Sequence, residues 1–544
     1  MKISGKYIII LTTLLIIASG CRQKEIFKVV NGPEFPWKTL SSLELAANAP
    51  YYNISYDSWS NPLGESNFYD FAASDISKLV PGITGNVPWL EYSSRKYRET
   101  ATTQSTRLYG IFNVLYKVIT SCNDPLNYLA QAEQSGQQLF PESSQAEIDA
   151  VVPRIKAELY FFRGFSYYYL VQLFCPPYDP NGANDTKILP LKNSFSYDPD
   201  SIRTTKIGTT KEIYDQIISD LTTAKKLMPL SYQEEGKVNY YAICGILARV
   251  YFMMGDYDDA LAECSEVIDK GPYSLPSNVD PIESWNKSPG ETPAPEVIWE
   301  FVPNENGNME AVETSITKVA PWGAINGGRG ADWVQCSWVQ FVLNDWVLKK
   351  IGWMKDPQHG DYTETAEAKA DKRYGQTWLR LEAYIPKPDN MDQIYYENHY
   401  QTLFTDVPFP MVFCDKFYRG KRCDVTKQPL LRLAELLLTR SIIRFEKGDR
   451  NGAAEDVNKV RVRAGLAPIA PGDLTADIID NERIKEMGAE DGDRLRYLIS
   501  LRRPIGLGDR TGMSPINPPY ENMYWKIPEE EIDLNGGYPP DFHQ

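Results

Sequence analysis

The sequence predicts a mostly α-helical protein whose helical part is interrupted by a loop-rich subdomain with short strands. Three observations lead to this prediction. Apolar residues recur at helical spacing in several segments, two distant stretches share the spacing of a helix-turn-helix hairpin, and the stretch between them is rich in tryptophan and turn-forming residues. The 544 residues are 42% hydrophobic and 24% charged, a globular composition that excludes collagens, coiled coils and disordered chains.

The first twenty residues differ from the rest of the chain. Lys2 and Lys6 form a basic start, an apolar run follows over residues 7–17, and three small residues precede Cys21. This order is typical of an export signal, and the apolar run is too short for a comfortable membrane span. A cysteine directly after small residues resembles a bacterial lipobox, in which the thiol is acylated, for example with palmitate, and becomes the mature N-terminus. We therefore expect a lipoprotein signal peptide over residues 1–20 and lipidation at Cys21. The alternative is a plain signal peptide followed by an incidental cysteine.

Two helices are predicted in the N-terminal half. Apolar positions at spacings of three, four or seven predict a helix over residues 154–174. The run Cys175-Pro176-Pro177 ends it, because proline lacks the amide hydrogen and clashes with the preceding turn. A second helix is predicted to begin at Thr209, where Glu212 completes a capping box, and to end before Pro229. Its buried positions are expected to be Ile213, Ile217, Leu221, Ala224 and Met228.

Two helical hairpins are predicted further along. Small residues let two antiparallel helices approach, a glycine makes the turn, and aromatic residues fill the groove. In the first hairpin, over residues 238–275, the residues with the relative spacing of a tetratricopeptide unit are Ala248, Tyr251, Gly255, Tyr257, Ala260 and Pro272. In the second, the residues at equivalent offsets are Ser441, Gly448, Ala453, Val457 and Val460. The alternative for either match alone is an ordinary helical hairpin.

The stretch between the hairpins is predicted to be a loop-rich subdomain. Residues 276–427 contain eight of the twelve tryptophans and turn-forming sequences such as Ser288-Pro289-Gly290. Loops on a rigid scaffold usually carry the binding groups of a protein. We therefore expect an N-terminal helical region over residues 21–275 with a loop-rich early segment, a ligand-binding subdomain over 276–427, and a C-terminal helical region over 428–544 that completes the helical domain.

Several polar and reactive side chains are interpreted as structural. Cys244 and Cys264 lie in apolar helical patterns and are expected to be buried. A Cys414–Cys423 disulfide is chemically allowed in an oxidising compartment. We expect Trp299, in an alternating strand pattern, to be a core residue. We expect Arg461 and Arg463 to form ion pairs between helices with Glu482 and Glu486. In the run Tyr167-Tyr168-Tyr169, adjacent helical residues point in different directions, so we expect one or two rings to pack in the core and the third to reach a partner.

The sequence does not predict an enzyme or a nucleic-acid-binding protein. The formal net charge of −15 favours neither nucleic acid nor anionic lipid headgroups as partners. The three histidines, His359, His399 and His543, are far apart, which makes a multi-histidine metal centre unexpected. The catalytic motifs of serine hydrolases, zinc proteases, P-loop proteins and Rossmann enzymes are missing from the sequence. No cofactor is expected.

One loop raises the question of a structural calcium ion. It is rich in oxygen ligands, but it lacks the spacing of an EF-hand, so we interpret it as a solvated loop. Its oxygen-bearing residues are Asp179, Asn181, Asn184 and Asp185.

Several segments, taken in their shared order, resemble the SusD/RagB-like nutrient-binding lipoproteins of the outer membrane of Bacteroidetes-type bacteria. The resemblance covers nearly the whole mature chain. It depends on the shared order of the segments, because no single segment is specific enough alone. The segments are residues 109–123, 157–173, 217–221, 247–257, 432–435, 454–466, 482–490 and 526–531.

This resemblance implies a non-enzymatic protein with a SusD-like fold. Such proteins capture an oligosaccharide, or in some branches a peptide, at the cell surface and act as a lid over a SusC-like TonB-dependent transporter. The tetratricopeptide helices face that partner, and the loop-rich part carries the ligand site. The implied location is the outer membrane, lipid-anchored and facing the exterior. The alternatives are a peptide-binding RagB-like receptor, a scaffold that holds only partner proteins, and a surface glycosidase.

The candidate ligand residues combine aromatic platforms with polar neighbours. An exposed aromatic ring covers the flat C–H face of a sugar, while amide, carboxylate and guanidinium groups bond its hydroxyls. Each candidate tryptophan has burial in the core as its alternative. The aromatic candidates are Trp89, Tyr92, Trp285, Trp322 and Trp333, and the polar ones are Asn326, Arg329 and Asp332.

Overall fold

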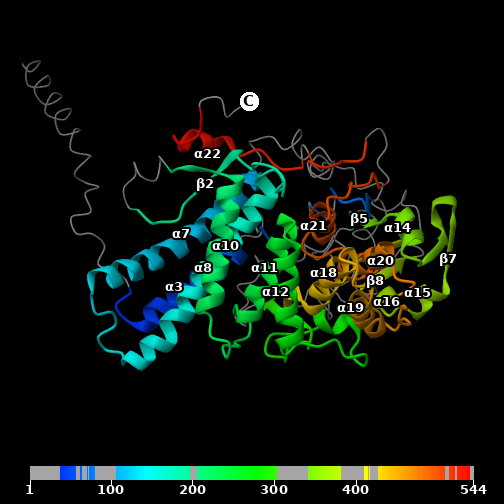
Figure 1. The fold of residues 1–544 in the computed structure, drawn as a ribbon, viewed down its shortest axis with the longest axis horizontal. Coiled ribbons are helices and arrows are strands. Elements are labelled where there is room, and N and C mark those ends of the chain that lie inside the picture. The colour runs from blue at the N-terminus through cyan, green and yellow to red at the C-terminus, as the bar shows by residue number, and fades with distance from the viewer. Residues whose placement is uncertain are drawn as a thin grey trace, which may run out of the picture.

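The computed structural model describes residues 37–56, 62–63, 70, 73–79, 106–196, 205–302, 341–381, 410–414, 416, 427–508, 514–520 and 523–539. The body is elongated, with α3, α7 and α8 at one end and α18 to α21 towards the other (Figure 1). The α-helices are α3 (Leu40–Tyr56), α7 (Thr106–Ser135), α8 (Gln145–Phe174), α10 (Thr210–Leu227), α11 (Tyr240–Met254), α12 (Tyr257–Lys270), α14 (Asp345–Lys350), α15 (Ala366–Ala370), α16 (Arg373–Gln376), α18 (Leu433–Glu446), α19 (Arg450–Arg463), α20 (Ala476–Met487), α21 (Asp493–Ser500) and α22 (Glu529–Leu534). Two 3-10 helices are η2 (Pro281–Trp285) and η5 (Pro357–His359).

Short strands pair two by two between the helices. The pairs are antiparallel: β1 (Ser77–Leu79) with β5 (Phe341–Leu343), β2 (Lys187–Pro190) with β3 (Ile207–Thr209), β4 (Val297–Phe301) with β10 (Gln428–Arg432), β6 (Met354–Asp356) with β7 (Asp361–Glu364), and β8 (Trp378–Leu381) with β9 (Met411–Cys414). The β4–β10 pair brings the chain before residue 302 back beside the start of α18. The predicted fold class, mostly helical with short strands, is confirmed. The predicted division of the chain at residues 275 and 427 stays a prediction.

The long helices α7 and α8 form one end of the body, with α3 packed on both and α10 packed along α8. The predicted helix ending at Phe174 is confirmed, but it begins at Gln145 rather than at residue 154. Its true start is a capping box between Ser144 and Glu147, and the helix continues through Pro153. The capping box predicted at the start of α10, between Thr209 and Glu212, is present, and its predicted apolar positions are buried.

Both predicted hairpins are present, as α11 with α12 and as α18 with α19. Each turn contains a glycine with positive φ, Gly255 at 82° and Gly448 at 88°, a conformation that costs glycine little because it has no Cβ. Helix α12 packs against α18 (Figure 1). The two hairpins, far apart in the sequence, are therefore neighbours in one helical layer.

An aromatic cluster fills the junction between α8 and β4. Trp299 is 3% exposed, as predicted, and its ring lies edge-on to Phe161 and Phe165, with centroids 5.2 and 5.4 Å away. The expectation that one tyrosine of the run 167–169 reaches a partner is wrong, because all three rings are buried. Helices α10, α7 and α3 pack on α8 and α11 also contacts it, so α8 is covered more completely than its own sequence indicates.

The buried thiols are also as predicted. Cys244 and Cys264 are free and buried, and Cys414 is buried as well. Burial raises the pKa of Cys244 and Cys264, so these groups stay protonated. The suggested partner of Cys414, Cys423, lies outside the described residues. Among the helices that the structure describes, none combines the length and apolar character needed to cross a membrane.

Candidate functional site

Most of the predicted ligand residues lie outside the described part of the chain. They are Trp89, Tyr92, Trp322, Asn326, Arg329, Asp332 and Trp333, and the lipidation site Cys21 lies outside it as well. Their roles stay predictions. The described residues show what supports the neighbouring loop-rich segments and where the scaffold itself is hollowed.

Trp285 is a core residue rather than an exposed platform, so its assignment to the ligand surface is wrong. The side chain at the end of η2 is 2% exposed. The Arg432 guanidinium lies 5.2 Å from its ring centroid, and the Lys416 ammonium lies 5.9 Å away. Two cations from distant segments thus contact the ring that a sugar would need.

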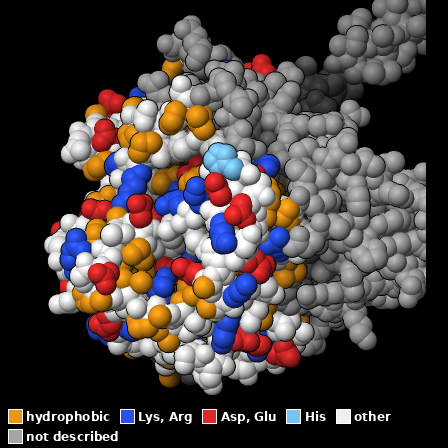
Figure 2. Space-filling model, turned by 90° about the vertical axis from the view of Figure 1, so that its right-hand side faces the viewer, with side chains coloured by type: hydrophobic (Ala, Val, Ile, Leu, Met, Phe, Trp, Pro, Cys, Tyr) orange, Lys and Arg blue, Asp and Glu red, His pale blue; other side chains and the backbone are white. Residues whose placement is uncertain are grey.

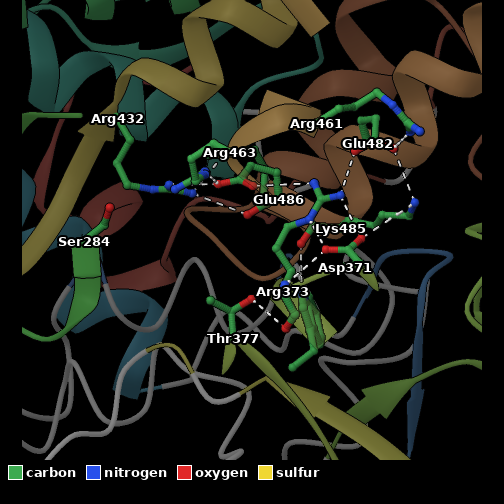
Figure 3. A network of polar contacts seen from close by, with 12 residues as sticks. Ser284, Asp371, Arg373, Thr377, Arg432, Arg461, Arg463, Glu482, Lys485 and Glu486 are labelled. Carbon is green, nitrogen blue, oxygen red and sulfur yellow. Dashed lines mark hydrogen bonds and ion pairs between the residues drawn. The ribbon is translucent and has the colours of Figure 1, made fainter. Parts of the chain in front are cut away.

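A buried network of charged side chains surrounds Glu486 on α20 (Figure 3). Its carboxylate accepts hydrogen bonds from Arg432 Nη1 at 3.0 Å and Arg463 Nη2 at 2.5 Å. Arg373 Nη1 lies 3.5 Å from its second oxygen. Arg463 also donates to Glu296 at 2.8 Å. The network therefore links α19, α20 and β10 to residues of the predicted loop-rich subdomain.

Glu482, one turn earlier on α20, holds a second group of cations. It accepts a hydrogen bond from Arg373 Nη2 at 2.7 Å and another from Arg461, and Lys485 lies 3.3 Å away (Figure 3). Arg373 also pairs with Asp371 at 2.8 Å. The predicted ion pairs from α19 to α20 are confirmed, as Arg461–Glu482 and Arg463–Glu486.

The network is buried at the junction between the second hairpin and the loop-rich subdomain. The side chains of Arg373, Glu482 and Glu486 are each at most 3% exposed. Burial alone raises the pKa of Glu486, but Arg463, Arg432 and Arg373 outweigh it and hold the pKa well below its usual range. The buried cations are thus matched by ionised carboxylates.

The same balance predicts an acid-sensitive stability. Burial raises the pKa of Glu482, but Arg373, Lys485 and Arg461 outweigh it, and the pKa falls from 4.5 to about 2. A carboxyl whose pKa is lower in the folded state contributes stability above its unfolded pKa and loses it as the pH falls towards the folded value. The free energy of unfolding should therefore fall between pH 4.5 and about 2, measured by urea unfolding at a series of pH values. Glu482→Gln should show a shallower fall over the same window, and curves of equal slope would contradict this assignment.

The scaffold carries a cavity of about 320 Å³ beside β4. The connection from α10 to α11 forms one wall, the segment after α12 a second, and the approach to β4 a third. The lining residues are Gln233, Glu234, Glu235, Gly236, Lys237, Asn239, Pro272, Tyr273, Pro293, Ala294, Pro295, Val297, Ile298, Trp299 and Glu300. Its volume is at the lower end of the range for small-molecule sites.

The oxygen-rich loop after α8 is held by its own hydrogen bonds. Asn184 Nδ2 donates to the Asp179 carbonyl at 2.7 Å, and the Asp179 amide donates to Asn184 Oδ1 at 2.9 Å. Asp179 in turn accepts from the amide of Asn181. Within the described ranges, histidine, cysteine and acidic side chains form no group of three or more that could hold a metal ion. The side chains of Asp179 and Asn184 are thus bonded within the loop itself.

The surface at the end of the molecule seen in Figure 2 is mixed in character. Basic and acidic side chains are interspersed over it, with apolar side chains between them. One ion pair with an exposed lysine joins Lys349 to Asp356, at 3.0 Å. Mixed charge of this kind keeps a surface soluble and gives it no strong preference for polyanions.

Comparison with known proteins places the chain in a family. One family profile, described as "Starch-binding associating with outer membrane", matches residues 78–252, and a second, described as the SusD family, matches residues 295–498. SusD-like protein P25 of Formosa agariphila is 24% identical over 323 residues, which are 57% of this chain and 54% of that protein. SusD-like protein P2 of the same organism is 24% identical over 269 residues, 48% of this chain and 46% of that protein. The chain thus spans about half the length of the curated relatives it matches.

Solved structures match over nearly the whole chain. A SusD superfamily protein from Bacteroides thetaiotaomicron has a TM-score of 0.68 at 21% identity and covers 92% of this chain and 98% of its own. A structure named as a putative sugar binding protein, from Bacteroides vulgatus, has a TM-score of 0.69 at 18% identity, with 94% and 100% covered. A SusD-like carbohydrate binding protein from the same species has a TM-score of 0.65 at 16% identity, with 92% and 97% covered.

These likenesses establish the SusD-like fold. The two profiles match in chain order, one before helix α12 and the other after it. The chain belongs to the SusD/RagB family, a family of non-catalytic binding proteins associated with the outer membrane.

Proposed function

We propose that this protein is a lipid-anchored receptor on the outer surface of the outer membrane, which binds an oligosaccharide and delivers it to a SusC-like TonB-dependent transporter. The observation that carries the proposal is the pair of family profiles, one of them described as starch-binding, which together extend over residues 78–252 and 295–498. Similar structures named as sugar- or carbohydrate-binding proteins support it.

The proposed ligand surface belongs to the predicted subdomain 276–427 and the early segment around residues 89–92. Trp322 and Trp333 supply flat rings for the C–H faces of sugars, and the polar side chains between them bond the hydroxyls. The polar groups are Asn326, Arg329 and Asp332, and the early segment adds Trp89 and Tyr92. Loops of this kind need a rigid support, and the buried network around Glu486 joins α19 and α20 to Arg373 and Glu296 of the same predicted subdomain.

The proposed anchor is Cys21, and the run from Arg22 to Glu25 begins the tether that follows it. A single acyl chain holds a protein only marginally, whereas two or more hold it stably. Full lipidation of the cysteine would keep the receptor at the membrane, next to a transporter in the same membrane.

The ligand proposal is tested on the soluble chain that begins at Arg22. It is titrated with plant, host and microbial glycans and with mixed peptides, while heat and tryptophan fluorescence are followed together. We expect saturable binding of one glycan class, and Trp322→Ala should weaken it by about 1–2 kcal/mol, a factor of roughly 5 to 30, because one ring contact and its apolar area are lost.

Tyr52→Ala is the matched control, since Tyr52 is an aromatic residue of α3 that is 55% exposed and lies outside both proposed ligand segments. It should bind glycans like the unmodified chain. Saturable binding of peptides without glycans would assign the chain to the peptide-binding alternative. Unchanged affinity in Trp322→Ala would remove Trp322 from the ligand surface.

A further inference from the structure

The cavity beside β4 is formed by the helical scaffold and lies apart from the proposed ligand loops in the sequence. Its walls come from residues 233–239, 272–273 and 293–300, all within the described part of the chain. The chemistry of the cavity therefore follows from the side chains that line it, and the cavity is not part of the function proposed above.

Glu300 supplies a carboxylate with unused acceptor capacity. The residue is 4% exposed and lines the cavity, and neither carboxylate oxygen accepts a hydrogen bond from a described residue. Lys427 Nζ, the nearest cation, lies 3.5 Å from Oε1. That ammonium group contacts Glu235 and the backbone carbonyl of Glu291 more closely. A buried carboxylate of this kind is expensive unless donors reach it.

The two lysines of this region are already engaged, whereas the carboxylates are in excess. Lys427 is fully buried against its own partners. Lys237 contacts Asn48 and lies 4.2 Å above the ring of Tyr51. Glu234 accepts one hydrogen bond, from Tyr232 at 2.8 Å. The cavity thus favours a ligand that brings hydrogen-bond donors or a positive charge, and it disfavours an anion.

The apolar part of the lining suits a flat ring, beside the polar side chains of Gln233 and Asn239. Proline rings at positions 272, 293 and 295 and the aromatic ring of Tyr273 lie around the cavity with Val297. Such surfaces contact the C–H face of a pyranose, while a carboxylate bonds its polar substituents. Burial raises the pKa of Glu300 and Lys427 partly offsets the rise, which leaves the pKa at about 7. A cation that enters the cavity would therefore favour the ionised form.

We propose that this cavity binds one ring of an amino sugar with a free ammonium group, which Glu300 holds by a charge-assisted hydrogen bond. The described residues around it form no metal-ligand group, which favours an organic cation over a metal ion. A lysine side chain or the amino end of a peptide carries the same ammonium group, but the proline and tyrosine rings that line the cavity favour contact with a sugar ring. The site is separate from the proposed platform around Trp322.

The test is calorimetric titration of the soluble chain from Arg22 with glucosamine and with a short, fully deacetylated glucosamine oligomer. Glucose, N-acetylglucosamine and a glycyl-lysine dipeptide are the comparison ligands. We expect glucosamine to bind at least tenfold more tightly than glucose or N-acetylglucosamine, and Glu300→Gln to remove this preference. Glu263→Gln is the matched control, because Glu263 pairs with Lys225 at 2.8 Å and does not line the cavity.

A second variant guards against a folding defect in Glu300→Gln. Pro293 is exposed and lines the cavity, so Pro293→Trp should fill the opening while keeping the Glu300 carboxylate, and it too should abolish glucosamine binding. Absence of glucosamine binding by the unmodified chain would overturn the proposal, as would binding that survives Pro293→Trp. Equal affinity for glucose and glucosamine would remove the ammonium specificity, and tighter binding of the dipeptide would assign the cavity to peptide amines instead.

Discussion

Replacing Glu486 with alanine should lower the free energy of unfolding by about 3–5 kcal/mol, because it leaves buried guanidinium groups without a counter-charge. Its carboxylate bonds Arg432 and Arg463 and lies 3.5 Å from Arg373. All of these side chains are at most 3% exposed. Glu296 and Glu490 continue to bond some of these cations, so the loss is limited to the share that Glu486 carries. Urea unfolding at neutral pH measures it.

The control for this change is Asp215→Ala on the surface of α10. Asp215 pairs with Lys211 at 2.7 Å, but both side chains are more than half exposed. Exposed pairs contribute little, so the free energy of unfolding should change by less than about 0.5 kcal/mol. Similar losses in the two variants would show that the buried network does not hold the junction together.

Replacing Arg163 with alanine should destabilise the other end of the molecule by a similar amount, about 3–5 kcal/mol. Arg163 on α8 makes a two-pronged contact with Asp220 on α10, with Nε–Oδ2 at 2.8 Å and Nη2–Oδ1 at 2.6 Å. Its remaining nitrogen donates to Asn123 on α7 at 2.8 Å. Removing it leaves the buried Asp220 carboxylate with Gln216 as its remaining bonded side chain among the described residues.

A double substitution separates the charge effect from lost packing. Arg163→Met with Asp220→Ala removes both charges and keeps an apolar stem, so it should recover part of the stability that Arg163→Ala loses. Thermal unfolding of the single and double variants gives the coupling between the two sites. Strictly additive losses would mean that the contact contributes little to joining α8 and α10.

The sequence predicts the parts of this fold that depend on neighbours along the chain. The helix end at Pro176, the capping box at Thr209 and the glycine turns of both hairpins are local features, and the structure confirms them. The pairing of Arg461 and Arg463 with α20 also follows from residues close in sequence. Local chemistry was sufficient for each of these.

The features that depend on distant segments could not be predicted. Trp285 looked like an exposed platform because nothing nearby shows that Arg432 and Lys416 cover its ring. The tyrosines of residues 167–169 lie in the part of α8, residues 161–171, where every residue is buried, which its periodicity does not indicate. Arg373 and Glu486 are far apart in the chain and meet only in the folded protein. The cavity at Glu300 likewise requires three separate segments to come together.

The scaffold and the proposed binding surface therefore have different origins in the chain. The helical layer comes from two hairpins that adjoin through α12 and α18, and a buried charge network fixes its junction with the segment between them. Binding groups are commonly carried by loops on such a scaffold.

We propose that the protein binds a saccharide without changing it. Equilibrium dialysis of the soluble chain against each glycan class, followed by chromatography of the recovered glycan, tests it most directly. We expect saturable retention of one glycan class and recovery of that glycan with its chain length unchanged. Release of new reducing ends, or saturable binding of peptides with no retention of any glycan, would contradict the account.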